Sequence, residues 1–392
     1  MSEAPSQSVR VDLGDRSYDV TIGTGTLDQL TQIIASTCPS SAKAMLVLDH
    51  NLPQATVERA AGAIQSAGLH VFQQVLIASE EHKSTSTHAD LLVRMAQCGL
   101  DRQDIVVTLG GGIVGDVGAY AAATYMRGIR CVQCPTTLLS MVDASVGGKT
   151  GVNLLTHDDN DTWSLLKNYA GCFWQPRAVV ADISTLASLA PRHYRAGIAE
   201  CLKHTLLSNR IDPDLLDWTH ANLDRIIAQS PSVLTELVTR NVAVKARVVE
   251  GDEREESTTG PGRAALNLGH TFAHVLEGLH HLTPTTNPSD APLLHGECVA
   301  MGLIAASSAS ASLELVPQAM VEGVAQAVAD AGLPSRIDAL PDNETLRSLM
   351  LRDKKTRGST LRLILPVPDA SVVLRDDVPS DAIDDAWNAI RA

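Results

Sequence analysis

Short runs of β-branched and other apolar residues alternate with helical stretches from residue 9 to about residue 185. Strands separated by helices are typical of βαβ units, so this half of the chain is predicted to form a mostly parallel sheet in an α/β domain. The runs predicted as strands are VRVDL, YDVTIG, AMLVLD, HVFQQVLI, DIVVTLG, IRCVQCPTT and AVVADI.

The pattern changes at about residue 190. Long Ala- and Leu-rich segments follow, such as residues 224–253 and 297–316, with apolar residues at helical spacing. Strand signals return only in LRLILPV, residues 361–367. A chain of 392 residues, at about 150 residues per domain, predicts two domains, which we place at 1–187 and 188–392 with the second mainly α-helical. Two-domain enzymes commonly have the active site in the crevice between the domains.

The composition is that of an ordinary globular protein, with 44% hydrophobic and 19% charged residues. A net charge of −14 argues against a nucleic-acid-binding protein, although local basic clusters could still bind a phosphorylated molecule. Aromatic residues make up 3% of the chain, so stacking platforms for bases are not expected. No apolar stretch reaches the roughly 18 residues of a membrane span, and the N-terminal residues lack the apolar core of a signal peptide.

The seven cysteines are scattered and odd in number, which is typical of reduced thiols in a cytoplasmic protein. Cys131 and Cys134 form a CxxC pair, but no second pair exists to complete a zinc site. They lie in the apolar run CVQCPTTLL and are therefore interpreted as part of a buried strand. Segments 154–166 and 281–293 are rich in Asp, Asn, Thr and Pro and are predicted to be surface loops.

A glycine turn follows the predicted strand DIVVTLG. Gly110, Gly112 and Gly115 match G-x-G-x-x-G and precede a predicted helix, VGAYAAATYM. In this context, backbone N–H groups can approach a pyrophosphate at the helix N-terminus. The next predicted strand lacks the acidic residue that usually binds the ribose, and Asp49, at the end of AMLVLD, is a candidate for that role. A plain tight turn remains the alternative to nucleotide binding.

A second glycine turn lies in PTTLLSMVDASVGGKTGVN, residues 135–153. Thr136 and Thr137 follow a predicted strand and could bind phosphate or ribose through their hydroxyls. Asp143 and Lys149 flank the Gly-Gly pair. The segment is not a Walker loop, because Asp143 occupies the position of the first glycine in that pattern.

The second half of the chain carries residues that commonly bind metals. Glu200 and the lysine at 203 lie on one helix face, and His270 and His274 lie on another. Two histidines and a carboxylate form a catalytic zinc set, which by spacing alone could be His270, His274 and Glu277, while an HxxxH pair can also be a packed or surface pair. The HExxH pattern of zinc proteases fails at Thr271.

Basic residues occur near these motifs, namely Arg127, Lys245, Arg263 and the segment RDKKTRG at 352–358. They could simply be solvated surface charges. In an acidic chain, cations beside glycine turns and histidines favour an anionic substrate instead.

Five strings together resemble the 3-dehydroquinate synthase family: GGGIVGDVGAYAAATYMRGIR, PTTLLSMVDASVGGKTGVN, RAGIAECLKH, LNLGHTFAH and LLHGE. The resemblance extends from about Asp49 to the C-terminus. It implies a Rossmann-like NAD-binding domain followed by a mainly helical domain that binds the metal and the substrate. It also implies a cytoplasmic homodimer.

The activity implied by this resemblance is the conversion of 3-deoxy-D-arabino-heptulosonate 7-phosphate to 3-dehydroquinate and phosphate, a step of the shikimate pathway. The implied cofactors are NAD and Zn²⁺ or Co²⁺. The implied course is transient oxidation at C4, elimination of phosphate, re-reduction and intramolecular aldol closure, with no net redox change. Because histidine ligands must be neutral, we expect activity to fall in mildly acid buffer.

The resemblance also assigns roles to individual residues. The implied metal ligands are Glu200, His270 and His295, which revises the set proposed from spacing. The implied NAD-binding residues are Asp49, Ser79, Glu80, Lys83, Ser84, Gly112, Ile113, Val114, Gly115, Asp116, Thr136, Thr137, Lys149, Lys167, Thr185 and Leu186. The implied substrate-binding residues are Arg127, Asp143, Lys149, Asn168, Lys203, Lys245, Arg263, Asn267, His274 and Lys354 or Lys355.

The chain departs from the family pattern at two insertions. Residues 154–166 separate the GVN string from Lys167 and Asn168, and the gap between His274 and His295 is longer than usual. Other sugar phosphate cyclases, acting for example on sedoheptulose 7-phosphate, and metal-dependent polyol dehydrogenases are the alternatives. The retained residues expected to meet the substrate carboxylate favour the dehydroquinate reaction; they are Lys245, Arg263, Asn267 and His274. A catalytically inactive sugar-phosphate-binding protein would be expected to have a broken metal trio.

Overall fold

The structure is a computed structural model that describes residues 6–157, 163–209, 211–285, 287–354 and 361–392. The chain divides into two compact units. The first comprises residues 1–190 and 229–246, and the second comprises residues 191–228 and 247–392. No helix in these described ranges is long and apolar enough to cross a membrane.

The first unit is built on a seven-stranded sheet in the order β1-β2-β9-β6-β5-β3-β4. All neighbouring strands are parallel except β1, which pairs antiparallel with β2 at the edge. The predicted α/β sheet is therefore confirmed, with a strand at each of the seven apolar runs. The strands are β1 (Gln7–Val11), β2 (Tyr18–Gly23), β3 (Lys43–Asp49), β4 (His70–Leu76), β5 (Ile105–Gly110), β6 (Arg130–Pro135) and β9 (Ala178–Asp182).

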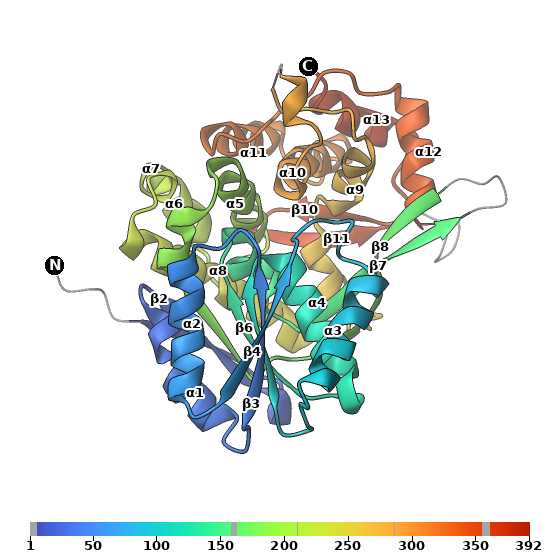
Figure 1. Ribbon diagram of the computed structural model, residues 1–392. Helices are drawn as coiled ribbons and strands as arrows, with labels where there is room; N and C mark the ends of the chain where they lie inside the picture. The colour runs from blue at the N-terminus through green and yellow to red at the C-terminus, as the bar shows by residue number, and fades with distance from the viewer. Residues whose placement is uncertain (1–5, 158–162, 210, 286, 355–360) are drawn as a thin grey trace. The chain divides into compact units, whose positions relative to one another are not determined.

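Helices cover both faces of this sheet (Figure 1). Helices α1 (Leu30–Thr37) and α2 (Gln54–Ser66) pack on one face, where their apolar residues share a core with alternate residues of β3, β5, β6 and β9. Helices α3 (Thr85–Gln97) and α4 (Gly112–Thr124) pack on the other face. A parallel sheet covered on both faces explains why its strands read as continuous apolar runs.

The CxxC cysteines lie in the central strand β6, as predicted. Cys131 and Cys134 are each 1% exposed, and burial raises the pKa of both thiols far above the ordinary value. They are therefore packing residues of low reactivity. None of the seven cysteines, all of which lie in the described part of the chain, forms a disulfide.

The prediction of a surface loop at residues 154–166 is wrong at both ends of that segment. Strands β7 (Lys149–His157) and β8 (Trp163–Phe173) form an antiparallel hairpin in which Leu154 pairs with Leu166 and Leu155 with Leu165. The Asp- and Asn-rich letters that indicated a loop are confined to the centre of the segment, and residues 158–162 lie outside the described residues. The flanking leucines and threonines have strand propensity and complete a backbone ladder.

The second unit is mainly helical, as predicted, and α10 (His295–Ser312) is its central helix. It contacts α5 (Pro191–Thr205), α9 (His270–Gly278), α11 (Gln318–Asp330) and α13 (Ser380–Ala389), and most of its residues are buried. Helices α6 (Leu215–Ala221), α7 (Leu223–Ile227) and α12 (Asn343–Lys354) also belong to this unit. Helix α8 (Pro231–Gly251) lies in the first unit up to residue 246 and ends in the second.

A short antiparallel hairpin of β10 (Leu363–Val367) and β11 (Ser371–Arg375) also belongs to the second unit. The sequence predicted β10 but not β11. Segment 281–293 contains one short 3-10 turn, η7 (Pro288–Asp290), in an otherwise irregular course. The other short turns are η1 (Gly14–Arg16), η2 (Thr26–Gln29), η3 (Tyr125–Arg127), η4 (Ser140–Ala144), η5 (Ile183–Ser188) and η6 (Gly262–Asn267).

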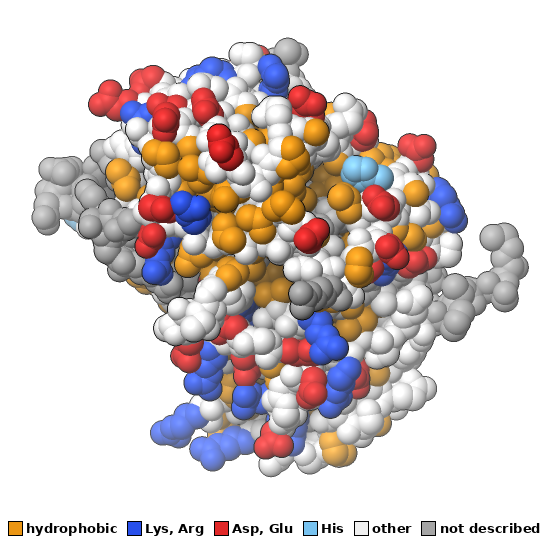
Figure 2. Space-filling view, turned by 180° about the vertical axis from the view of Figure 1, so that it is seen from behind, with side chains coloured by type: hydrophobic (Ala, Val, Ile, Leu, Met, Phe, Trp, Pro, Cys, Tyr) orange, Lys and Arg blue, Asp and Glu red, His pale blue; other side chains and the backbone are white. Residues whose placement is uncertain are grey.

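Acidic and basic side chains both occur on the face of the molecule shown in Figure 2. Hydrophobic side chains form a broad area in the upper half of this view, and several Lys and Arg side chains lie together with acidic ones in the lower half. The net charge of −14 therefore coexists with local groups of Lys and Arg, which is compatible with an anionic small molecule as ligand.

Candidate active site

The strand order of the first unit marks a binding position. From β3 the chain passes to β4 on one side and then returns to β5 on the other side of β3. In open α/β sheets, ligands bind beyond the carboxyl ends of the strands at such a reversal. Asp49 is the last residue of β3, and Gly110 is the last residue of β5. The acid and the glycine turn proposed from the sequence therefore lie at neighbouring strand ends.

The glycine turn leads directly into α4. Gly111 is the residue before the helix, and Gly112 to Asp116 form its first turns. A Cβ atom built at Gly111 would lie 3.1 Å from the Thr137 side chain, and one at Gly118 would lie 2.5 Å from that of Thr108. The glycines therefore let the helix approach the strands closely, which leaves the backbone N–H groups at its N-terminus accessible to an anion.

Several of the remaining proposed cofactor residues also follow strand ends. Thr136 and Thr137 follow β6, with Thr136 donating its backbone N–H to the carbonyl of Gly110 over 2.9 Å. Thr185 and Leu186 follow β9 in η5, and both are buried. The segment Ser79–Ser84 follows β4, and the hydroxyl of Ser84 accepts a hydrogen bond from the backbone of Thr87 to cap α3.

The buried Lys83 is the centre of a polar cluster in this unit. Its ammonium lies 2.5 Å from Asp116 Oδ2 and also donates to the side-chain oxygen of Asn168 in β8. Asn153 links the same parts: its amide donates to Glu80 Oε2 over 2.8 Å, and its side-chain oxygen accepts the backbone N–H of Asn168. Four of the residues implied by the resemblance are thus brought together. The sequence analysis did not assign Asn153, although it ends the GVN string.

Lys167 is exposed on β8, next to Asn168. Asn168 itself has a φ of +57°, a left-handed conformation that asparagine tolerates better than most residues. Lys149, at the start of β7, is exposed as well. Arg127 is exposed and has a φ of +69°, directly after Met126 at +49°. Two consecutive left-handed non-glycine residues are unusual and often accompany functional sites.

Lys245 and Asp143 form a buried ion pair in the first unit. Lys245 extends from α8, and its ammonium donates to the side chain of Asp143 and, over 2.5 Å, to the Asp143 carbonyl. Asp143 lies in the π-helical turn η4 that follows the Thr136–Thr137 pair. The two residues were proposed from motifs a hundred residues apart, and the fold brings them into contact.

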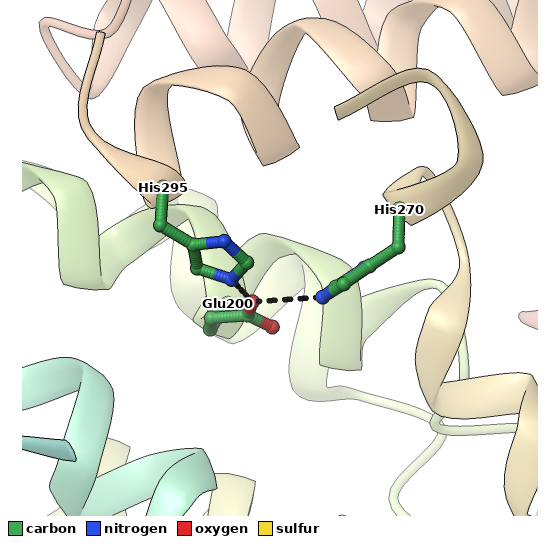
Figure 3. A group of neighbouring side chains, drawn as sticks. All are labelled: Glu200, His270 and His295. Carbon is green, nitrogen blue, oxygen red and sulfur yellow. Dashed lines mark ion pairs between the residues drawn. The ribbon is translucent and has the colours of Figure 1, made fainter. Parts of the chain in front are cut away.

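Three residues of the second unit converge as a candidate metal centre. Glu200 comes from the middle of α5, His270 begins α9, and His295 begins α10. The Nε2 atoms of His270 and His295 lie 3.6 and 3.4 Å from Glu200 Oε1. Figure 3 shows both imidazole rings pointing toward the carboxylate.

The geometry and chemistry of this trio fit a catalytic zinc or cobalt ion. Each residue offers one ligand atom, and the three atoms all lie within 4.8 Å of one another. A tetrahedral zinc with bonds of about 2.0–2.1 Å separates neighbouring ligand atoms by about 3.3 Å, close to the observed 3.4 and 3.6 Å. Two imidazoles and one carboxylate also leave a fourth position for a substrate oxygen.

The environment sets opposite protonation preferences for the two histidines. Burial and the Lys203 ammonium lower the pKa of His270 to about 3, so its ring is neutral. Burial also lowers the pKa of His295, but hydrogen bonds and charges from Glu200 and Glu277 outweigh that effect and raise the pKa to about 10. A cation that binds between these groups must therefore displace a proton from His295.

Close glycine contacts allow the three helices to approach one another. A Cβ atom built at Gly296 would lie 1.9 Å from the Ala196 carbonyl oxygen in α5, and one at Gly302 would lie 2.2 Å from that of Gly269. Gly296 follows His295, and Gly269 precedes His270. The first contact therefore brings His295 to the helix that carries Glu200, and the second brings the start of α9, with His270, to α10. Sequence reasoning did not identify these contacts, although Gly269 and Gly296 occur in its motif strings.

Of the substrate residues implied for the second unit, Lys203 and His274 lie beside this centre. Lys203 is buried one turn after Glu200, and its ammonium lies 2.5 Å from Glu200 Oε2. The rings of His274 and His270 are 5.9 Å apart. Arg263 is fully buried in η6 and donates to the Glu253 carbonyl over 2.5 Å.

Asn267 ends η6, and its amide donates to Glu255 Oε1 over 3.1 Å. Lys354 is the last residue of α12, and Lys355 lies outside the described residues. The set of His270, His274 and Glu277 that spacing allowed is not the cluster that forms, because Glu200 and His295 supply the other two ligand atoms beside His270.

Comparison with known proteins agrees with this geometry. Residues 73–196 match the 3-dehydroquinate synthase N-terminal family model, and residues 197–356 match the 3-dehydroquinate synthase C-terminal model. The chain belongs to the 3-dehydroquinate synthase family. A 3-dehydroquinate synthase from Symbiobacterium thermophilum is 35% identical over 97% of this chain and 100% of its own length. One from Halorhodospira halophila is 39% identical over 96% and 97%.

Two solved structures are also similar in fold to this member of the family. A 2-epi-5-epi-valiolone synthase from Streptomyces hygroscopicus subsp. jinggangensis 5008, solved with NAD⁺ and Zn²⁺, is 25% identical with a TM-score of 0.78, covering 97% of this chain and 98% of that one. A 2-deoxy-scyllo-inosose synthase complexed with carbaglucose-6-phosphate, NAD⁺ and Co²⁺ is 23% identical with the same TM-score, covering 97% and 99%. The expected fold class is confirmed.

Proposed function

We propose that this chain is a 3-dehydroquinate synthase that converts 3-deoxy-D-arabino-heptulosonate 7-phosphate to 3-dehydroquinate and phosphate in aromatic amino acid biosynthesis. The observation that carries the proposal is the convergence of Glu200, His270 and His295 in a chain whose two halves match the two family models. A metal ion bound to this trio would act as a Lewis acid on the substrate's alcohol and on the ketone formed from it.

The NAD site is proposed at the strand ends of the first unit, within residues 1–187. Asp49 can accept the ribose hydroxyls, and the N-terminus of α4 can bind the pyrophosphate. The hydroxyls of Thr136 and Thr137 extend the polar lining beyond β6. NAD, when bound, would accept the hydride from the substrate and return it. The relative bound to NAD⁺ and Zn²⁺ supports this cofactor pair.

Cationic side chains are proposed to hold the anionic groups of the substrate. Arg263 presents a planar guanidinium suited to a carboxylate, and Lys245 provides a point charge held by Asp143. Arg127, Lys149 and the lysine pair at 354 and 355 are proposed to bind the phosphate. A sugar phosphate analogue bound to the 2-deoxy-scyllo-inosose synthase supports a phosphorylated substrate.

Lys203 has a role that follows from its contact with Glu200. The ammonium lies 2.5 Å from Oε2 of the buried carboxylate, and this contact is proposed to orient Glu200 as a metal ligand. Lys203 is also proposed to bind a substrate hydroxyl beside the metal position. We further propose, as the resemblance implies, a homodimer in the cytoplasm, and the absence of disulfides fits a reducing compartment.

The test is an assay of purified, zinc-loaded protein with 3-deoxy-D-arabino-heptulosonate 7-phosphate and NAD⁺, in which phosphate and NADH are followed together. We expect phosphate release without accumulation of NADH, because the hydride is returned in each turnover. Accumulating NADH without phosphate would identify a dehydrogenase instead. Turnover of sedoheptulose 7-phosphate in place of the expected substrate would overturn the assignment of Arg263 and Lys245 to a substrate carboxylate.

A further inference from the structure

Glu277 lies behind one of the proposed metal ligands. Its Oε1 atom is 2.6 Å from Nδ1 of His295, and its side chain is only 7% exposed. The other ring nitrogen of His295, Nε2, is the atom that lies 3.4 Å from Glu200. The imidazole of His295 therefore contacts the buried Glu277 carboxylate through Nδ1 and faces the proposed metal position through Nε2.

The two histidine ligands are supported differently. Nδ1 of His270 lies 3.1 Å from the carbonyl of Leu268, a neutral acceptor two residues away in the same segment. The side chain of His270 is 13% exposed, whereas that of His295 is 40% exposed and belongs to the first residue of α10. Packing alone therefore restrains the ring of His295 less, and the contact with Glu277 supplies the missing restraint.

Helix α9 consequently carries one of the two histidines and contacts the other. Its first residue is the ligand His270, and Glu277, two turns later on the same helix, reaches His295. The separation of these positions, seven residues, places them on one face of the helix. The spacing that made Glu277 a candidate ligand in the sequence reflects this shared face.

We infer that Glu277 is a positioning residue for the metal centre, an inference that rests on the proposed metal site. It accepts the Nδ1–H of His295, which selects the tautomer whose Nε2 lone pair is available to the metal and fixes the orientation of the ring. The negative charge of Glu277 also makes that nitrogen a stronger donor. Glu277 binds neither the metal nor the substrate in this arrangement.

The experiment measures zinc affinity without any substrate. Metal-free wild-type protein and the variants E277A, E277Q and E277D are titrated with zinc against a chromophoric chelator, and Co²⁺ absorption spectra report the geometry of the site. We expect E277A to bind zinc about 10–100-fold more weakly, as is typical for loss of such a partner. E277Q keeps the shape without the charge and should weaken binding less, and E277D should recover part of the affinity.

The control is E322Q, the same chemical change at an exposed position of α11. It should bind zinc like the wild type. Thermal unfolding of the metal-free proteins identifies any variant that does not fold, and in that case E277Q, which preserves size, decides the question. Wild-type zinc affinity in E277Q and E277D, with an unchanged Co²⁺ spectrum, would overturn the inference.

Failure of the inference and failure of the proposed function are distinguishable. If the wild type binds one zinc tightly and all the Glu277 variants have the same zinc affinity, the proposed metal site is supported and the positioning role of Glu277 is refuted. If the wild type and E322Q bind no zinc, the metal site of the proposed function falls and the inference falls with it.

Discussion

Replacing Gly296 by alanine tests how closely the helices of the metal centre must approach. Gly296 directly follows His295 in α10 and packs against Ala196, which lies one turn before Glu200 in α5. An added Cβ atom would lie 1.9 Å from the Ala196 carbonyl oxygen, whereas real Cβ atoms essentially never come within 3.0 Å of another heavy atom. The two helices must therefore separate by roughly 1 Å, because a backbone oxygen cannot rotate away.

Two effects of opposite sign set the size of the change. Alanine gains about 0.5–1 kcal/mol over glycine in a helix. Overpacking a close contact costs about 1–3 kcal/mol, and a clash with backbone belongs in the upper part of that range. We therefore expect a net loss of about 1–2 kcal/mol in the free energy of unfolding. For a unit of this size, that loss corresponds to a fall of about 2–8 °C in Tm.

The assay combines calorimetry of the metal-free protein with a zinc titration. Because His295 Nε2 now lies 3.4 Å from Glu200, a displacement of roughly 1 Å exceeds the tolerance of about 0.5 Å for a preorganised site, so zinc affinity should fall by about tenfold or more.

The matched control for this variant is Gly323→Ala in α11, where an added Cβ meets nothing within 4 Å. That change should raise stability by about 0.5–1 kcal/mol. If the Gly296 variant were as stable as the Gly323 variant and bound zinc normally, the close-contact argument would be refuted.

Three further predictions concern other sites. Although burial lowers the pKa of His295, Glu200 and Glu277 raise it to about 10. The stability that this protonated group contributes to the metal-free protein is therefore complete below about pH 6.5 and is lost as the pH rises toward 10. Measurements of Tm across that pH range will check this. Lys245→Met removes the cationic partner of the partly buried Asp143 and should lower the free energy of unfolding by about 2–3 kcal/mol, measured by urea denaturation. An unchanged midpoint would show that the ion pair contributes little to stability. Ala327→Leu extends into an apolar cavity of about 140 Å³ between α5, α6, α10 and α11 and should raise Tm by about 1–4 °C, whereas a lower Tm would mean that the cavity cannot accept the side chain.

The activity of the loaded enzyme should also depend on pH. Protons compete with the metal for the histidines, so activity is expected to fall as the buffer becomes mildly acid. A pH–rate profile that stays flat down to about pH 5 would contradict this expectation.

The sequence determined the local elements of this protein. Each of the seven apolar runs became a strand, and the turn Gly110–Gly115 led into a helix, because strand propensity and glycine conformations depend on neighbouring residues. The helix face shared by Glu200 and Lys203 follows from helical periodicity in the same way. The proposed set of metal ligands came from the resemblance of the motif strings to the family, since spacing alone allowed another set.

Only the tertiary structure decided which distant residues meet. The sequence predicts a loop at residues 154–166, where the structure has the paired ends of β7 and β8, because each strand is recognisable only by its pairing with the other. Likewise, Glu277 was a possible ligand by its spacing, and its contact with His295 depends on how α9 packs beside α10. That packing is set by contacts such as Gly296 on Ala196. Such contacts join residues far apart in the chain, and no local pattern of hydrophobic and polar positions specifies the distance at which two helices cross.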